Sequence, residues 1–143
     1  MRMDRLTTKS QEAVREAVSN AVRRGNPEVI PEHLLIAILT QDGGVGGPLV
    51  EKAGAEAKAV VAELEQRVQG LPQVSGGAEP SFGRRLVPLL TRAEDEAKKL
   101  KDDFVSVEHF LLAAVKNDKD VQAIFDRHGL SYDKLMHALA EIR

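Results

Sequence analysis

The sequence contains one hexapeptide pattern twice, as Glu-His-Leu-Leu-Ile-Ala at residues 32–37 and Glu-His-Phe-Leu-Leu-Ala at residues 108–113. The two copies lie 76 positions apart, which is about half of the 143-residue chain. At the same offset Ala17 corresponds to Ala93, and past residue 42 an offset of 75 continues the agreement. Because the shared positions are mainly apolar residues and glycines, the pattern indicates one helical unit that occurs twice around a common core.

Apolar residues recur at helical spacing through both halves, and residues that start or stop helices delimit them. Thr7 can cap the first helix by accepting a hydrogen bond, Gly25 can end it in the left-handed conformation, and Pro31 suits a first helical position. Pro88 interrupts the fifth pattern, so the regular helix is expected to begin near Val87–Pro88 or to be kinked there. Eight helices are expected. The first lies between Thr7 and Gly25, and the other seven are at about 31–40, 48–53, 55–69, 82–101, 106–116, 120–128 and 131–142.

These patterns predict an all-α fold of eight helices in two pseudo-symmetric four-helix repeats that form one compact domain. The first repeat is expected at about 5–69, a linker rich in Gly and Pro at about 70–80, and the second repeat at about 81–143. No strand is expected anywhere. The two most apolar helices, 31–40 and 106–116, are expected to be central.

Composition argues against several classes of partner. The net charge of −2, from 20 basic and 22 acidic residues, gives no electrostatic reason to bind nucleic acid, and aromatic residues make up only 3%. No window approaches the length of a membrane span, and the start has no apolar signal segment. The absence of cysteine fits a reducing cytoplasm. We therefore expect a cytoplasmic protein without membrane contact, whose isolated domain is monomeric.

Catalytic and metal-binding motifs are missing. The glycine-rich stretch 43–47 is followed by Pro48 where a phosphate-binding loop needs lysine, so it is interpreted as a flexible connector. The histidines have no metal-ligand spacing and are expected to be structural. Glu32 and Glu108 fall in first helical turns, where a carboxylate interacts favourably with the helix dipole. An enzyme that uses these glutamates and the histidines is the weakest alternative, so no catalytic residue, metal or cofactor is expected in this chain.

Apolar surface remains as the feature most suited to function. Phe104 and Val107 lie beside Asp102, and their repeat counterparts, Glu28 and Pro31, do not require either to be buried. They are therefore the best candidates for an exposed apolar edge rimmed by carboxylates, which would mark an interaction site. Burial of both side chains in the core is nevertheless the favoured outcome, because most large apolar side chains are buried. Val105 corresponds to Val29 and is expected in the core.

Three stretches resemble the amino-terminal domain of Clp-type AAA+ unfoldases, a helical module made of two repeats. They are Arg-Leu-Thr-Thr-Lys at 5–9, Pro-Glu-His-Leu-Leu-Ile-Ala-Ile-Leu at 31–39 and Val-Ser-Val-Glu-His-Phe-Leu-Leu-Ala-Ala at 105–114. The resemblance covers essentially the whole chain. Within the family, the opening 1–7 and the linker segment 71–76 are most similar to the ClpB branch.

The resemblance implies a role in protein disaggregation. Proteins of the ClpB branch are ATP-driven homohexamers that thread aggregated polypeptides through a pore and work with an Hsp70 (DnaK-type) system. It implies that this domain binds unfolded or aggregated clients, and that ATP and magnesium belong to AAA+ modules absent from these 143 residues. Thr7, Asp102 and Glu108 match polar positions associated with client engagement in the family, and Pro88 departs from its usual residue. An adaptor-docking domain of a protease-linked, ClpA- or ClpC-like ATPase is the alternative.

Overall fold

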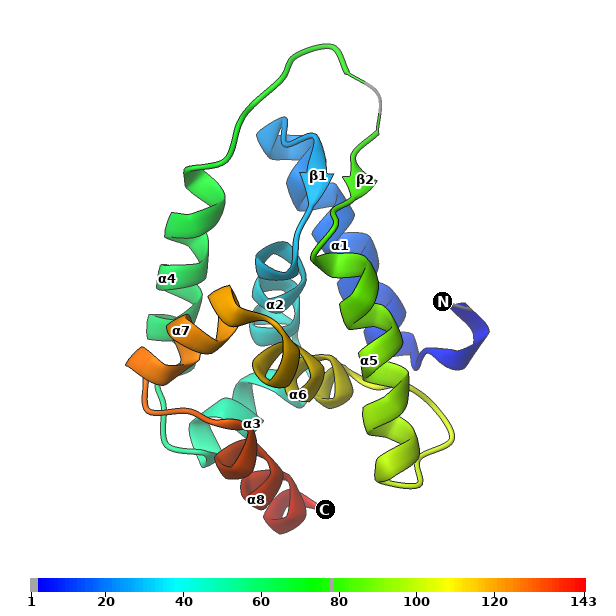
Figure 1. Ribbon diagram of the computed structural model, residues 1–143, viewed down its shortest axis with the longest axis vertical. Coiled ribbons are helices and arrows are strands. Elements are labelled where there is room, and N and C mark those ends of the chain that lie inside the picture. The colour runs from blue at the N-terminus through cyan, green and yellow to red at the C-terminus, as the bar shows by residue number, and fades with distance from the viewer. Residues whose placement is uncertain (1–2, 78) are drawn as a thin grey trace.

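The computed structural model describes residues 3–77 and 79–143, so Met1, Arg2 and the linker residue Ala78 lie outside the description. Eight α-helices account for most of this part of the chain, and the predicted all-α fold is confirmed (Figure 1). A short 3₁₀ turn, Met3–Arg5, precedes them. The helices are α1 (Thr8–Arg24), α2 (Pro31–Thr40), α3 (Gly46–Lys52), α4 (Ala57–Gln69), α5 (Leu86–Lys99), α6 (Val107–Asn117), α7 (Lys119–Arg127) and α8 (Tyr132–Ile142).

The two most apolar helices, α2 and α6, lie at the centre, as their sequences predict (Figure 1). Residues 31–39 and 107–115 are all buried, so both helices are covered on every side. The long helix α1 packs on α2, and α5 packs on α6 in the equivalent way. Across the two halves α3 contacts α8 and α4 contacts α7. These contacts correspond to each other under the repeat offset, and they join the halves into one core.

The helix ends follow the sequence signals closely. Thr7 Oγ1 accepts a hydrogen bond from the Ser10 amide at 3.1 Å, and Gly25 ends α1 with a φ of 70°. The fifth helix begins at Leu86, which places Pro88 in the third helical position. The first amides of a helix have no partner within the helix, so proline removes no bond there. The prediction of a helix start near Val87–Pro88 is confirmed.

The prediction that the chain has no strand is wrong. Two-residue strands β1 (Glu28–Val29) and β2 (Ser81–Phe82) pair in parallel, and Leu6 forms an isolated parallel bridge with Val105. Segments this short carry no detectable alternation of polar and apolar residues. They pair because the backbone that leads into the central helices is buried and needs hydrogen-bond partners.

The two pairings are repeat-equivalent, and each one joins opposite halves of the chain. The Thr7 amide donates to the Val105 carbonyl at 3.1 Å, and the Gly83 amide donates to the Val29 carbonyl at 2.8 Å. The segment before the first helix of each repeat therefore pairs with the other repeat. We call this arrangement the segment exchange. The helix offset alone does not reveal it, because it concerns residues outside the helices.

The glycine-rich stretch is more ordered than a flexible connector. Helix α3 begins at Gly46, two residues before the predicted start at Pro48. A Cβ atom at Gly46 would lie 2.6 Å from Ile38 Cγ2 and 2.8 Å from the Ile38 carbonyl oxygen. Gly46 therefore permits the close approach of α3 to α2.

A Gly46→Ala substitution is expected to lower the free energy of unfolding by about 1–3 kcal/mol, because the added methyl group overpacks this contact. Gly44→Ala is the matched control, since its Cβ would meet only the side chain of Gln41, at 2.5 Å from Oε1. Urea unfolding of both variants measures the difference. Equal losses of stability in the two variants would contradict the packing role of Gly46.

Candidate functional site

The candidate site surrounds the start of α6 and is completed by the start of α1. Thr7 is brought there by the segment exchange, where its amide donates to the Val105 carbonyl. Ser10 Oγ donates to the same carbonyl at 2.8 Å, and Thr7 Oγ1 donates to Ser10 Oγ at 3.0 Å. Thr7 therefore lies beside the 102–108 segment, although it is about 100 residues distant in sequence. The bond network fixes the relative position of the two chain segments.

The two apolar candidates have different environments. Phe104 is 53% exposed, so the favoured burial in the core is wrong for it and the hypothesis of an exposed apolar residue holds there. Val107 is only 2% exposed, and the prediction of an exposed edge is wrong for it. Val107 is the first residue of α6, whose first turn is wholly buried, and it packs in the core as its counterpart Pro31 does. Val105 is buried, as predicted.

His109 organises the start of α6. Its Nδ1 accepts a hydrogen bond from the Ser106 amide at 2.8 Å, so the imidazole provides a partner for a backbone amide at the start of the helix. Because Nδ1 is an acceptor, the proton resides on Nε2, which donates to Asp102 Oδ2 at 2.7 Å. His109 is buried, and Asp102 is thereby held at the edge of the site.

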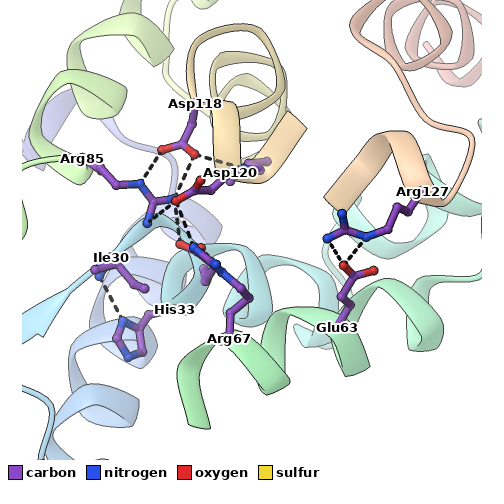
Figure 2. Close-up of polar contacts among 10 residues, drawn as sticks. Ile30, His33, Glu63, Arg67, Arg85, Asp118, Asp120 and Arg127 are labelled. Atoms are coloured by element: carbon purple, nitrogen blue, oxygen red, sulfur yellow. Dashed lines mark hydrogen bonds and ion pairs between the residues drawn. The ribbon is translucent and has the colours of Figure 1, made fainter. Parts of the chain in front are cut away.

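His33 has the same role in the first repeat, with a neutral partner. Its Nδ1 accepts from the Ile30 amide at 3.0 Å and its Nε2 lies 2.9 Å from Asn26 Oδ1 (Figure 2 shows the Ile30 contact). Burial, with a smaller contribution from the charge of Arg24, lowers the pKa of His33 to about 4. The repeat thus conserves the capping histidine, whereas Asn26 is replaced by the carboxylate of Asp102. Both histidines are structural, as expected.

Arg143 joins the two carboxylates of the candidate site. Its Nη2 lies 2.8 Å from Asp102 Oδ2 and 2.8 Å from Glu108 Oε2. Burial raises the pKa of Asp102, but hydrogen bonds from Arg143 and His109 outweigh it, so the pKa is lowered. The pKa of Glu108 is likewise lowered, because hydrogen bonds involving Ser106 and Arg143 outweigh the effect of burial. Both groups are therefore carboxylates at neutral pH.

The equivalent glutamate of the first repeat is enclosed. Glu32 is completely buried, and Arg85 Nη2 and Arg67 Nε lie 3.1 and 3.3 Å from its two oxygens. Arg85 also donates to both oxygens of Asp118, at 3.0 and 2.8 Å, and Arg67 donates to Asp120 at 2.9 Å (Figure 2). Glu32 does more than interact with its helix dipole: it joins α2 to α4, α5 and the start of α7. Neither arginine could be predicted as a partner of Glu32, because nothing near Glu32 in the sequence indicates them.

A further contact holds α4 against α7. Glu63 pairs with Arg127 and lies 2.9 Å from His128 Nε2 (Figure 2 shows the Arg127 contact). The hydrogen bond from Arg127 is the main reason that the pKa of Glu63 is lowered. Within residues 3–77 and 79–143, no three His, Cys, Asp or Glu side chains converge as metal ligands. In the same ranges, none of the helices has the length and apolarity to cross a bilayer.

The family described as the Clp repeat (R) N-terminal domain matches residues 5–128, which is most of the chain. The chain belongs to this family. Among curated relatives, the chaperone protein ClpB of Mycobacterium tuberculosis is 38% identical over 138 residues, which are 96% of this chain and 16% of the relative. The chaperone protein ClpB of Corynebacterium efficiens is 36% identical over 139 residues, with the same two shares. The Clp repeat domain therefore spans about a sixth of the length of these relatives.

Solved structures share the fold of this Clp repeat domain. The N-terminal domain of Hsp104 from Candida albicans superimposes with a TM-score of 0.84 at 23% identity, covering 96% of this chain and 91% of that one. The N-domain of ClpV from Vibrio cholerae has a TM-score of 0.81 at 23% identity, covering 97% and 85%. A complex of a ClpV N-domain with a VipB peptide has a TM-score of 0.76 at 24% identity, covering 92% and 82%.

Proposed function

We propose that this domain is the client-binding amino-terminal module of a ClpB-like protein disaggregase. One observation carries the proposal: in a Clp repeat domain, the exposed aromatic residue Phe104 lies along the chain between Asp102 and Glu108, two carboxylates that hydrogen bonds hold in place. An apolar ring rimmed by charge suits an extended polypeptide with exposed apolar side chains. The peptide held by a ClpV N-domain of the same fold supports binding of a partner segment.

The proposal extends to the whole protein of which such a domain forms part. There the module would weakly engage unfolded or aggregated chains in the cytoplasm and present them to a homohexameric AAA+ motor. That motor would bind ATP and magnesium and work with an Hsp70 system. The ClpB relatives, of which this chain matches 16%, support this extension.

Weak binding follows from the size of the site. Apolar burial contributes about 25 cal/mol per Å², before the cost of association is subtracted. A surface built around one aromatic ring therefore gives affinities of roughly micromolar to millimolar. Several copies in one ring would compensate through multivalency, while each contact stays reversible enough to release the client.

A more specific partner is the second candidate. The ClpV complex contains a peptide of one named protein, VipB, and this favours docking of a defined partner or adaptor by the Clp repeat fold. Titration of the isotopically labelled domain with a permanently unfolded protein, and with the folded form of the same protein, separates the two. We expect chemical-shift changes around Thr7, Phe104 and Glu108 with the unfolded form alone. Binding confined to the folded form would contradict the client-binding proposal.

Phe104→Ala is expected to weaken binding of an unfolded client by about 5- to 20-fold, which corresponds to the loss of roughly 1–2 kcal/mol of apolar contact. Phe82→Ala is the matched control, because Phe82 is also partly exposed (39%) but lies on β2 of the other exchanged pair. Fluorescence anisotropy of a labelled unfolded client measures both. If Phe82→Ala weakens binding as much as Phe104→Ala does, the site lies elsewhere.

A further inference from the structure

We infer that Arg143 is an internal occupant of the proposed client site, and that a cationic side chain of a client replaces it on Asp102 and Glu108. The inference rests on the proposed function and concerns how that site is regulated. Arg143 Nη2 lies 2.8 Å from an oxygen of each carboxylate, so one guanidinium occupies the polar edge of the site. A client with a basic residue beside an apolar one would offer the same group together with a contact to Phe104.

Arg143 is placed where it can leave at low cost. Its side chain is 39% exposed. Exposed ion pairs are individually weak because water and salt screen them. The two carboxylates, in contrast, are fixed by contacts with the buried part of the domain. Asp102 keeps its hydrogen bond to the buried His109, and Glu108 is buried in the first turn of α6.

In the first repeat, the glutamate equivalent to Glu108 is enclosed and cannot be reached by an external cation. Glu32, the counterpart of Glu108, lies between two guanidinium groups, those of Arg67 and Arg85. Both arginines are fixed on their far sides by further carboxylates, Asp120 and Asp118. A cation from outside has no opening there, because the carboxylate is completely buried and its neighbours are held in place.

The second repeat lacks one of these cations. The counterpart of Arg85 at the repeat offset is Lys9, which donates to the Asp42 carbonyl at 2.8 Å and pairs with Glu12 at 3.6 Å. The ammonium group of Lys9 therefore contacts residues of its own repeat instead of Glu108. Within residues 3–77 and 79–143, Glu108 pairs with one guanidinium, that of Arg143, whereas Glu32 pairs with two. Among these residues, the two carboxylates Asp102 and Glu108 therefore share a single arginine.

Two blocked dipeptide amides test the inference: acetyl-Phe-Arg-amide and acetyl-Phe-citrulline-amide, in which the uncharged citrulline has nearly the shape of arginine. Each is titrated into the labelled domain and followed by chemical shifts around Phe104 and Glu108. Arg143→Gln is expected to tighten binding of the Arg peptide by about three- to fivefold and to leave the citrulline peptide within about twofold. Glu108→Gln is expected to abolish the preference for the Arg peptide.

Arg127→Gln is the matched control, since Arg127 is an exposed arginine paired with Glu63 on the α4–α7 side, and its loss should leave both affinities unchanged. Equal or weaker binding of the Arg peptide to Arg143→Gln would overturn the inference. If an unfolded client still binds in that case, the proposed function stands without the internal occupant. If neither dipeptide nor an unfolded client binds any form of the domain, both proposals are wrong.

Discussion

Replacing Arg85 with methionine is expected to lower the free energy of unfolding by about 3 kcal/mol, because it leaves Glu32 buried beside a single remaining guanidinium. Arg85 Nη2 is 3.1 Å from Glu32 Oε1, and its guanidinium also donates two hydrogen bonds to Asp118. Without Arg85, the desolvation of the Glu32 carboxylate is no longer fully compensated. The resulting loss of stability is larger than the net stabilisation by the intact ion pair. Urea unfolding at neutral pH measures the effect.

Two controls separate buried charge from lost packing. Arg67→Met should cost less than Arg85→Met, because Arg67 is more exposed, with 47% of its side chain accessible against 33% for Arg85. The double variant Glu32→Gln/Arg85→Met removes both charges and should recover a large part of the loss. If the double variant is no more stable than Arg85→Met alone, uncompensated charge is not the cause.

Acidification from pH 6.5 to 4 is expected to remove about 3 kcal/mol of stability through His33 alone. Burial lowers the pKa of folded His33 to about 4 from its ordinary value of 6.5. Between these values the unfolded chain binds a proton that the folded chain does not, so stability falls by about 1.4 kcal/mol per pH unit as the pH decreases. Well above pH 6.5 His33 is neutral in both states, and this contribution no longer changes. Protonation would also abolish the acceptor at Nδ1 that caps α2 through the Ile30 amide.

His33→Gln isolates this effect, because glutamine in the third helical position can accept from the cap amide and does not titrate. Urea midpoints measured between pH 7.5 and 4 should then show a shallower dependence in the variant than in the wild type. Parallel curves for the two proteins would show that His33 does not titrate in this range. Absolute stability at pH 7.5 is a separate readout, since the glutamine replaces a buried ring.

Much of the fold follows from local rules that act within one helix. Thr7, Gly25 and Pro31 mark helix ends by their own backbone chemistry, and the doubled Glu-His pattern identifies the two central helices. The short strands could not be found in this way. Their pairing depends on two chain segments that meet only after the helices pack, and two residues carry no periodic signal.

The site was predicted less completely, for a related reason. Comparison of the repeats allowed Phe104 to be exposed, as its counterpart Glu28 is, although burial in the core was favoured. The same comparison allowed exposure of Val107 as well, but Pro31, its counterpart, is itself buried, and the sequence does not show this. Arg143 was missed because its contacts with Asp102 and Glu108 come from a helix end about 35–41 residues away.

The segment exchange has a consequence for synthesis of the chain on the ribosome. Ser10 Oγ and the Thr7 amide find their acceptor at Val105, which for Ser10 is 95 residues further along. The amino-terminal segment is therefore translated long before its partner, and it waits unpaired until the start of α6 has left the exit tunnel. The first repeat cannot complete its own folding during translation, since its last hydrogen bonds are supplied by the second. A domain proposed to bind unfolded polypeptides therefore keeps part of its own first repeat unpaired until Val105 has emerged from the ribosome.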